Sequence, residues 1–171
     1  DALTELVSPY FDEFYEAVGG SFVGVKKCGR ENAPRLMIDA HFDEIGMVVT
    51  DIHEGGYLSF SHMGGLDRRI MAASEVYIYG KEKIYGVICS KPPHLQQRGE
   101  FKKLQKLDEM LIDTGYSKEE LEKIVSIGDG IGFYEKTASL LGNRICGRSM
   151  DNKCCAAAAI IAAATLEKEK M

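Results

Sequence analysis

Short apolar segments separated by glycine-rich turns fill the middle of the chain, and they constrain its fold more than any other feature. Residues 47–52 and 57–60 flank Gly55-Gly56, which is the pattern of a β-hairpin. Residues 75–79 and 84–89, joined by a turn at 80–83, predict a second hairpin. Short strands at this spacing are typical of a small β-barrel or β-sandwich.

Helical and strand-like segments flank this β-rich region on both sides. Apolar residues at helical spacing predict an amphipathic helix over residues 2–17, and strands are predicted at 22–25 and 35–40. Beyond the β-rich region, residues 139–145 predict a strand, and the alanine-rich stretch from 152 to about 168 predicts a helix. A capping box at 117–120 predicts one short helix within the insert. We therefore expect an α/β domain formed by residues 1–45 and 138–171, interrupted by a β-rich insert at 46–137.

Composition narrows the class of protein. The 171-residue chain has a net charge of -5 and is 45% hydrophobic, which is typical of a globular protein with an apolar core. It has no basic, aromatic-interleaved patch, so nucleic acid or an anionic membrane is not expected as a partner. No signal peptide is visible, and residues 154–166 are fewer than the ~20 apolar residues of a membrane span. The five cysteines show no C-x-x-C spacing, so we expect small buried thiols in a reducing cytoplasm.

The apolar run at residues 35–40 ends at His41, which Asp43 and Glu44 follow closely. Ligands bind beyond the carboxyl ends of strands in open α/β sheets. On an extended backbone, residues 41 and 43 project to the same side. The imidazole could then bind a metal through one nitrogen while the carboxylate orients the ring. Alternatively, His41 is a polar residue at a strand end, hydrogen-bonded to a backbone group.

Asp151 is a second acid, placed just before the alanine-rich helix. It could serve as the helix N-cap, for which Asp is favoured, or as a ligand. It lies 110 residues from His41, so only the fold could bring the two together. Turn and loop roles suffice for His53, His62 and His94.

Five motifs, in the same order, resemble those of the cytosolic two-metal aminopeptidases that include glutamyl aminopeptidase and the tetrahedral (TET) peptidases. Residues 41–46 (HFDEIG) closely resemble that family's HMDEIG. The other four are GGLD at 64–67, GVICSKPPHL at 86–95, LIDTG at 111–115 and GRSMDNK at 147–153. Phe42 and Cys89 depart from the family's Met and Gly, and neither stands at a ligand position. The resemblance covers nearly the whole chain from about residue 10 onward.

The resemblance implies an α/β metallopeptidase domain interrupted by a β-barrel-like insert used for dimerisation and assembly. His41 would be a terminal metal ligand, Asp151 the carboxylate that bridges two divalent ions, and Asp43 the catalytic-site acid that supports the histidine. The ions would be zinc or cobalt, with manganese a further option. The substrates would be peptides, and the protein would be a cytoplasmic homo-oligomer, from a dimer up to a dodecamer.

The two ends of the chain suggest that further sequence belongs to the protein. The chain opens on Asp1 instead of Met, and it stops at Met171 directly after a helix. The family's Glu-Glu pair, which holds the general base, and its later ligands would follow that helix. We therefore expect little or no peptidase activity and weak metal affinity from this chain alone. Two functions stay open: an aminopeptidase of which this is the first part, or a non-catalytic dimerisation and assembly fragment.

Overall fold

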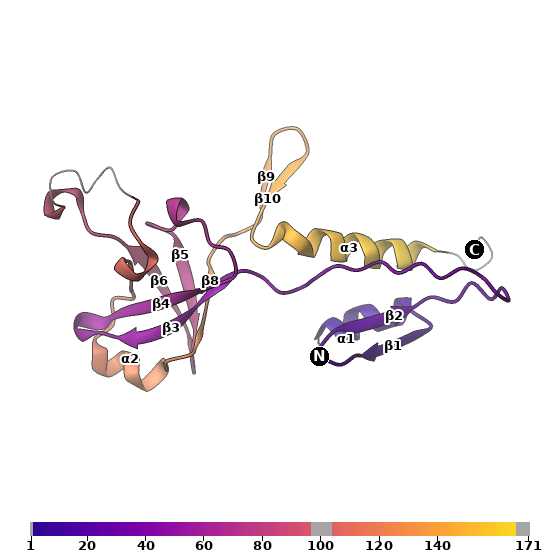
Figure 1. Ribbon diagram of the computed structural model, residues 1–171, viewed down its shortest axis with the longest axis horizontal. Helices are drawn as coiled ribbons and strands as arrows, with labels where there is room; N and C mark the ends of the chain where they lie inside the picture. Colours follow the sequence, from indigo (N-terminus) through magenta and orange to yellow (C-terminus); the bar gives the residue numbers. More distant parts are fainter. Residues whose placement is uncertain (1, 97–103, 167–171) are drawn as a thin grey trace. The chain divides into compact units, whose positions relative to one another are not determined.

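The computed structural model describes residues 2–96 and 104–166, and its internal contacts divide the chain into two units (Figure 1). Unit 1 comprises Asp1–Asp43 and Met150–Met171, and unit 2 comprises Glu44–Ser149. The chain therefore has one continuous unit inserted into a discontinuous one. These contact-based units change after residues 43 and 149, whereas the sequence analysis placed the insert at residues 46–137.

Unit 2 is built on a closed barrel of six antiparallel strands in the order β3-β4-β7-β6-β5-β8. The two predicted hairpins are confirmed as β3 with β4 and β5 with β6, in registers that pair Val49 with Phe60 and Tyr77 with Tyr85. The strands are β3 Gly46–Ile52, β4 Tyr57–Met63, β5 Glu75–Tyr79, β6 Lys83–Cys89, β7 Leu111–Asp113 and β8 Gly130–Phe133.

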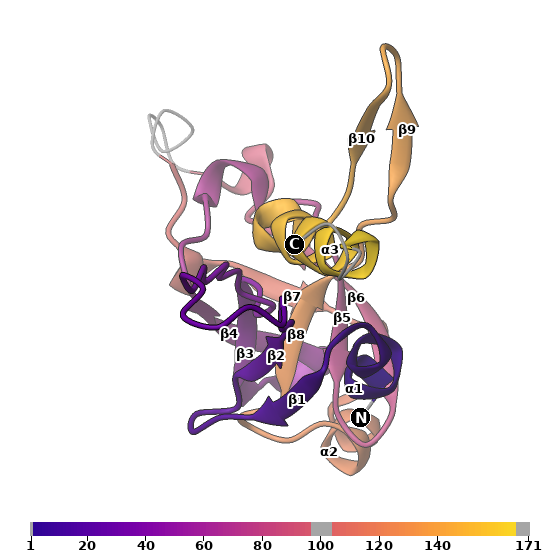
Figure 2. The same cartoon turned by 90° about the vertical axis from the view of Figure 1, so that its right-hand side faces the viewer.

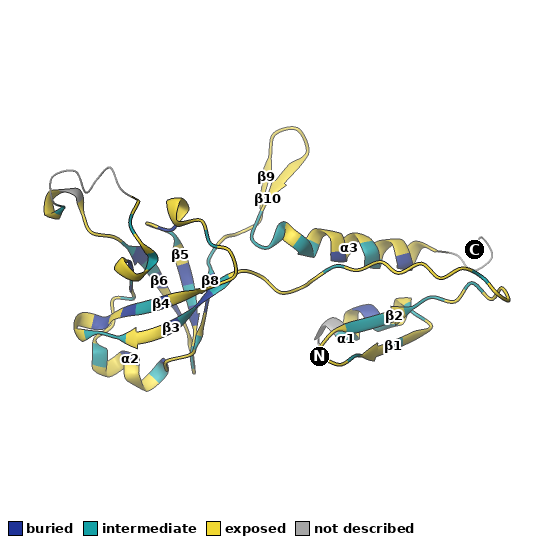
Figure 3. Cartoon of the chain, viewed as in Figure 1, coloured by how far each residue is buried: buried dark blue, intermediate teal, exposed yellow. Residues whose placement is uncertain are grey.

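The barrel encloses an apolar core, and buried residues alternate with less buried ones along β3, β5 and β6 (Figure 3). Leu58, Ile78 and Ile112 are fully buried in it. Gly86 permits close packing there, since a Cβ at that position would lie 2.7 Å from the Cγ2 of Ile112. The buried core cluster consists of Met47, Val49, Leu58, Phe60, Met71, Val76, Ile78, Ile84, Ile88, Met110, Ile112, Leu121, Val125 and Ile131.

Short helices cover the barrel and connect its strands. Helix α2 (Lys118–Ile124) begins with the predicted capping box: the Ser117 hydroxyl accepts from the Glu120 amide, and the Glu120 carboxylate accepts from the Ser117 amide. Leu121 anchors this helix in the core. The 3-10 turns of unit 2 are η2 Glu54–Gly56, η3 Arg68–Ile70, η4 Pro93–Leu95 and η6 Leu107–Glu109.

The last part of unit 2 differs from the prediction. The strand expected at 139–145 is a hairpin of β9 (Ala138–Leu140) and β10 (Arg144–Cys146), whose two strands lie side by side in Figure 2. Gly142 and Asn143 adopt positive φ and form the turn. The guanidinium of Arg148 donates to the carbonyl oxygen of Phe133, at the end of β8. This bond ties the segment after the hairpin to the barrel, which explains why unit 2 extends to residue 149.

Unit 1 carries α1 (Ala2–Val7), η1 (Ser8–Tyr10), β1 (Glu13–Glu16), β2 (Phe22–Val25) and α3 (Met150–Thr165). The strand predicted at 22–25 is confirmed, but the helix predicted over 2–17 is wrong beyond its first turns. Pro9 stands in a tight 3-10 turn, and the chain becomes extended at Phe11. Residues 13–16 then pair with 22–25, and the rings of Phe14 and Phe22 stack with centroids 5.8 Å apart. The end of the last predicted helix, from residue 167, lies outside the described residues.

The strand predicted at 35–40 is also wrong. These residues have no regular secondary structure, and the side chains of Leu36, Met37 and Ile38 are exposed. A strand forms only where a neighbouring strand accepts and donates its backbone hydrogen bonds. In the described part of the chain, no strand pairs with this segment.

The structure also bears on the predicted burial of the cysteines and on the predicted absence of a membrane-spanning helix. All five cysteines are free, but Cys146, Cys154 and Cys155 are exposed, so the expected burial of the thiols is wrong for these three. Cys28 and Cys89 are partly buried, and burial raises the pKa of the Cys89 thiol. Among residues 2–96 and 104–166, no helix is long and apolar enough to cross a membrane.

Candidate functional site

The His41 imidazole lies between two carboxylates of unit 1. Its Nδ1 is 3.1 Å from the Oδ1 of Asp43 and 3.2 Å from the carbonyl oxygen of the same residue. Its Nε2 is 3.5 Å from the Oδ1 of Asp151. The structure thus brings together the three residues that the sequence singled out, although Asp151 is far from the other two in the chain. The backbone contact of the alternative interpretation is present as well.

Local backbone geometry places each of these side chains at the end of a segment. His41 and Asp43 lie in the irregular stretch before β3, not at the end of a strand. Asp151 has extended dihedrals (φ -90°, ψ 106°), and regular helical dihedrals in α3 resume after Asn152. The carboxylate of Asp151 is therefore placed near the N-terminus of a helix, where the aligned backbone N–H groups favour negative charge.

The distance between His41 Nε2 and Asp151 Oδ1 provides a test of whether the two residues fit a metal ion. Zinc–nitrogen and zinc–oxygen bonds of about 2.0–2.2 Å at a tetrahedral angle place two ligand atoms about 3.4 Å apart. The observed 3.5 Å matches this separation. Nitrogen and carboxylate donors also suit zinc, cobalt and manganese. The residues present therefore fit one edge of a coordination shell.

The rest of that shell does not come from nearby side chains. No set of three or more His, Cys, Asp or Glu residues within the described ranges is arranged to hold an ion. The site is also open to water, because the side chain of His41 is 53% exposed and that of Asp151 is 97% exposed. Two donors without burial give a weak metal site, and further ligands would have to complete it.

Glu44, which follows Asp43, takes part in a separate set of contacts within unit 2. Its carboxylate accepts a short hydrogen bond from the Ser149 hydroxyl and lies 3.3 Å from Nη2 of Arg148. Sequence reasoning grouped Glu44 with the histidine and missed both partners. The only signal was the polarity of residues 148–149 within a tight connection, and that pattern does not specify a partner.

The other motifs occupy structural positions in unit 2. The Asp67 carboxylate accepts from both the side chain and the backbone amide of Arg69, and the side-chain hydrogen bond is the main reason why its pKa is lowered to about 2. His62 Nδ1 contacts the carbonyl oxygen of Gly64, and His53 Nε2 lies 2.6 Å from the Ser59 hydroxyl. These contacts agree with the turn roles expected for the two histidines.

Comparison with known proteins identifies the family of this chain. The family model described as M42 glutamyl aminopeptidase matches residues 20–171. Lysyl aminopeptidase of Pyrococcus furiosus is 32% identical over 143 residues, which are 79% of this chain and 40% of that protein. A TET aminopeptidase from the marine sediment archaeon Thaumarchaeota archaeon SCGC AB-539-E09 has a similar structure, with a TM-score of 0.89 and 30% identity over 98% of this chain and 48% of that one.

A third similar structure is PhTET1-12s, solved as a dodecamer in the asymmetric unit, with a TM-score of 0.77 and 28% identity over 96% of this chain and 49% of that one. The chain spans about half the length of the relatives it matches. The family match covers most of the chain, including the residues around His41 and Asp151. The chain therefore belongs to the M42 glutamyl aminopeptidase family.

Proposed function

We propose that this protein is a metal-dependent aminopeptidase, and that His41, Asp43 and Asp151 form the first part of its active site. The observation that carries the proposal is the His41 ring, whose two nitrogens face two different carboxylates at 3.1 Å and 3.5 Å. This arrangement is typical of a metal-binding histidine with a supporting acid. Membership of the M42 family supplies the reaction class.

Each of the three residues would have a distinct task. With a proton on Nδ1 of His41, the Asp43 carboxylate would accept it, and the lone pair of Nε2 would then be free to bind a metal ion on the side of Asp151. Asp43 is therefore a positioning residue. His41 and Asp151 would supply part of the ligand set for two divalent ions, zinc or cobalt or manganese. When bound, such ions lower the pKa of a water molecule and polarise the scissile carbonyl group.

The two units would divide the work of the whole protein. Unit 1 would contribute to the peptidase domain, and the barrel of unit 2 would serve assembly into a homo-oligomer, from a dimer up to a dodecamer. The dodecamer of PhTET1-12s supports this proposal, as does the closed barrel with its own buried core. The substrates would be peptides with a free amino terminus, cleaved in the cytoplasm.

A second candidate function is a non-catalytic assembly module. The observation in its favour is the contrast between the two units: the whole core cluster lies in unit 2, whereas the three site residues are exposed. Under this alternative, the barrel would assemble with other copies, and His41 and Asp151 would hold no catalytic metal.

A metal-reconstitution experiment distinguishes the two functions. The protein expressed from its complete reading frame is stripped of metal and supplied with zinc, cobalt or manganese. Hydrolysis of a series of aminoacyl p-nitroanilides is then measured. We expect metal-dependent turnover that Asp151→Asn abolishes and that Asp43→Asn reduces about 10–100-fold.

The matched control is His62→Ala. This substitution removes an exposed histidine of the barrel whose Nδ1 contacts the carbonyl oxygen of Gly64. This variant should keep the parent activity. Metal-dependent turnover that survives Asp151→Asn would refute the proposed role of the residue. Absence of turnover with every metal, in a protein that still assembles, would favour the assembly module.

A further inference from the structure

Two neighbouring cysteines of α3 carry exposed thiols. Cys154 and Cys155 lie in the regular part of the helix, which follows Asn152, and both are exposed. The Cys154 thiol donates to the carbonyl oxygen of Met150, and the Cys155 thiol is hydrogen-bonded to Cys154. The two sulfur atoms are therefore close enough to bind one and the same atom. Among the five cysteines of the chain, no other two are adjacent in the sequence.

The backbone favours the dithiol form of this pair over a disulfide. A disulfide requires Cα atoms about 4.4–6.8 Å apart, whereas consecutive Cα atoms are only about 3.8 Å apart. Direct oxidation of the two thiols would therefore distort the first turns of α3. An atom inserted between the two sulfurs lengthens the bridge and relaxes this restriction. The pair is thus better suited to hold a small thiophilic centre than to form a disulfide.

We propose that Cys154 and Cys155 form a binding site for trivalent arsenicals, with one arsenic atom bonded to both sulfurs. An aryl arsenoxide, ArAs=O, reacts with two thiols to give ArAs(SR)2 and water. Two As–S bonds form, the As=O bond and two S–H bonds break, and both thiol protons leave in the water. Arsenic stays trivalent throughout, so the step needs neither an oxidant nor a reductant. The aryl carbon takes the third valence of arsenic, so two protein ligands suffice.

The surroundings of the pair favour an arsenical over a soft metal cation. Thiols are soft donors, and they select soft centres. The hydrogen bond with Cys154 raises the pKa of the Cys155 thiol, and the Asp151 carboxylate acts in the same direction. Cys155 therefore keeps its proton at neutral pH, which disfavours a cation that requires two preformed thiolates. In the part of the chain that the structure describes, no three His, Cys, Asp or Glu side chains are grouped to hold such a cation.

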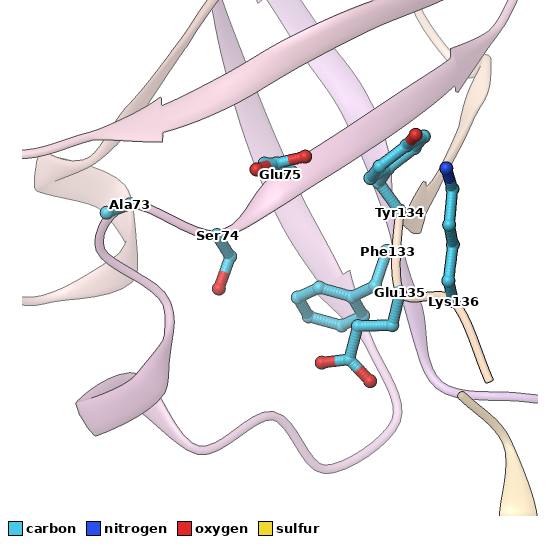
Figure 4. A pocket seen from close by; sticks show the side chains of 7 residues that line it. All are labelled: Ala73, Ser74, Glu75, Phe133, Tyr134, Glu135 and Lys136. Carbon is cyan, nitrogen blue, oxygen red and sulfur yellow. The ribbon is translucent and has the colours of Figure 1, made fainter. Parts of the chain in front are cut away.

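An open pocket of unit 2 would not compete for this ligand. It has a volume of about 360 Å³ and is lined by residues 73–75 and 133–136 (Figure 4). The acceptor groups of its side chains are oxygens, among them the carboxylates of Glu75 and Glu135 and the hydroxyl of Ser74. Oxygen donors suit hard ions, so a pocket without sulfur offers a trivalent arsenical no favoured bond. The thiol pair of α3 is therefore the preferred place for it.

Phenylarsine oxide is the probe, and mass spectrometry of the intact, reduced 171-residue chain is the measurement. We expect one phenylarsenic group per chain, bound with loss of one water, and peptide mapping should place it on Cys154 and Cys155. A dithiol such as dithiothreitol should remove the group, whereas a monothiol at the same concentration of S–H groups should not. Cys154→Ser and Cys155→Ser should each weaken binding about a hundredfold or more, because the second bond of a chelate forms at a high effective concentration.

The matched control is Cys146→Ser, which removes an exposed thiol from β10. It should bind the arsenical as the parent chain does, and circular dichroism melts verify that all variants are folded. A parent chain that takes up no phenylarsenic group, or a Cys154→Ser or Cys155→Ser variant that binds it as tightly as the parent, would overturn the site. The measurement involves neither a divalent metal nor peptide hydrolysis, so either result leaves the proposed aminopeptidase function to its own test.

Discussion

The division of the chain into a barrel with a core and a unit with exposed apolar residues makes a quantitative prediction for two leucines. Leu58 of β4 is fully buried, and it faces Ile112 across the β4–β7 pair. Leu36 of unit 1 is 87% exposed. Replacing each by alanine removes the same atoms, so the two variants differ only in the surroundings of the side chain.

The expected magnitudes follow from these surroundings. Leu58→Ala removes about three buried carbon groups at roughly 0.8 kcal/mol each, and the cavity left in the core adds to this loss. We expect the free energy of unfolding of the barrel to fall by about 3–4 kcal/mol. Leu36→Ala should change it by less than about 0.5 kcal/mol, because the removed atoms are already in water.

Urea unfolding of the 171-residue chain measures both values. The chain has no tryptophan, so the near-ultraviolet circular dichroism of the packed rings of Tyr77, Tyr85 and Tyr134 reports on the barrel. With a slope of about 1–3 kcal/mol per molar urea, Leu58→Ala should lower the midpoint by roughly 1–4 M. A loss at Leu36 as large as that at Leu58 would refute the reasoning, since it would mean that residues 35–40 are packed in solution.

Three further predictions test single sites. In an NMR titration the Asp67 carboxyl should have a pKa of about 2, and Arg69→Gln should raise this pKa towards 3.8. Because the pKa is lower in the folded state, the stabilisation by Asp67 is present above pH 3.8 and is lost as the pH falls towards 2. Gly56→Ala should lower the thermal midpoint of unfolding far more than Gly115→Ala, although both positions have positive φ. At Gly56 the new Cβ would lie 1.7 Å from a backbone carbonyl oxygen, whereas at Gly115 nothing lies within 4 Å of it. Zinc should bind the 171-residue chain weakly and shift the ring signals of His41 in NMR spectra, and a chelator should reverse the shift. An unchanged His41 signal at millimolar zinc would contradict the proposal that His41 and Asp151 are metal ligands.

The barrel could be predicted from the sequence because its signals are local. Gly55-Gly56 separates two alternating segments, and the alternation determines which residues face the core, so the hairpins follow from the pattern alone. In unit 1 the local signals predicted β2 and the alanine-rich helix α3, but they failed for two other segments. The helix expected over residues 2–17 fails where Pro9 interrupts it, and the strand at 35–40 would have needed a partner that the local pattern does not supply.

The sequence alone could predict only part of the candidate site. The H-x-D spacing correctly anticipated that His41 and Asp43 would lie together, although the segment is irregular and not a strand. Spacing could not connect either residue with Asp151, and only the resemblance of the surrounding motifs did so. The contacts of Glu44 with Arg148 and Ser149 escaped prediction, because polar residues in a connection have many possible partners.

Those missed contacts explain how residues so distant in sequence meet. Glu44 and Ser149 are the first and last residues of unit 2, and they are hydrogen-bonded across a separation of 105 residues. Consecutive Cα atoms are only 3.8 Å apart, so joining these two ends also brings Asp43 and Met150, their immediate neighbours, close together. Bringing the ends of so long a segment together lowers the entropy of the chain, and folding of the barrel compensates for this loss. The hydrogen bond between Glu44 and Ser149 therefore accounts for the closeness of the chain at residues 43 and 150.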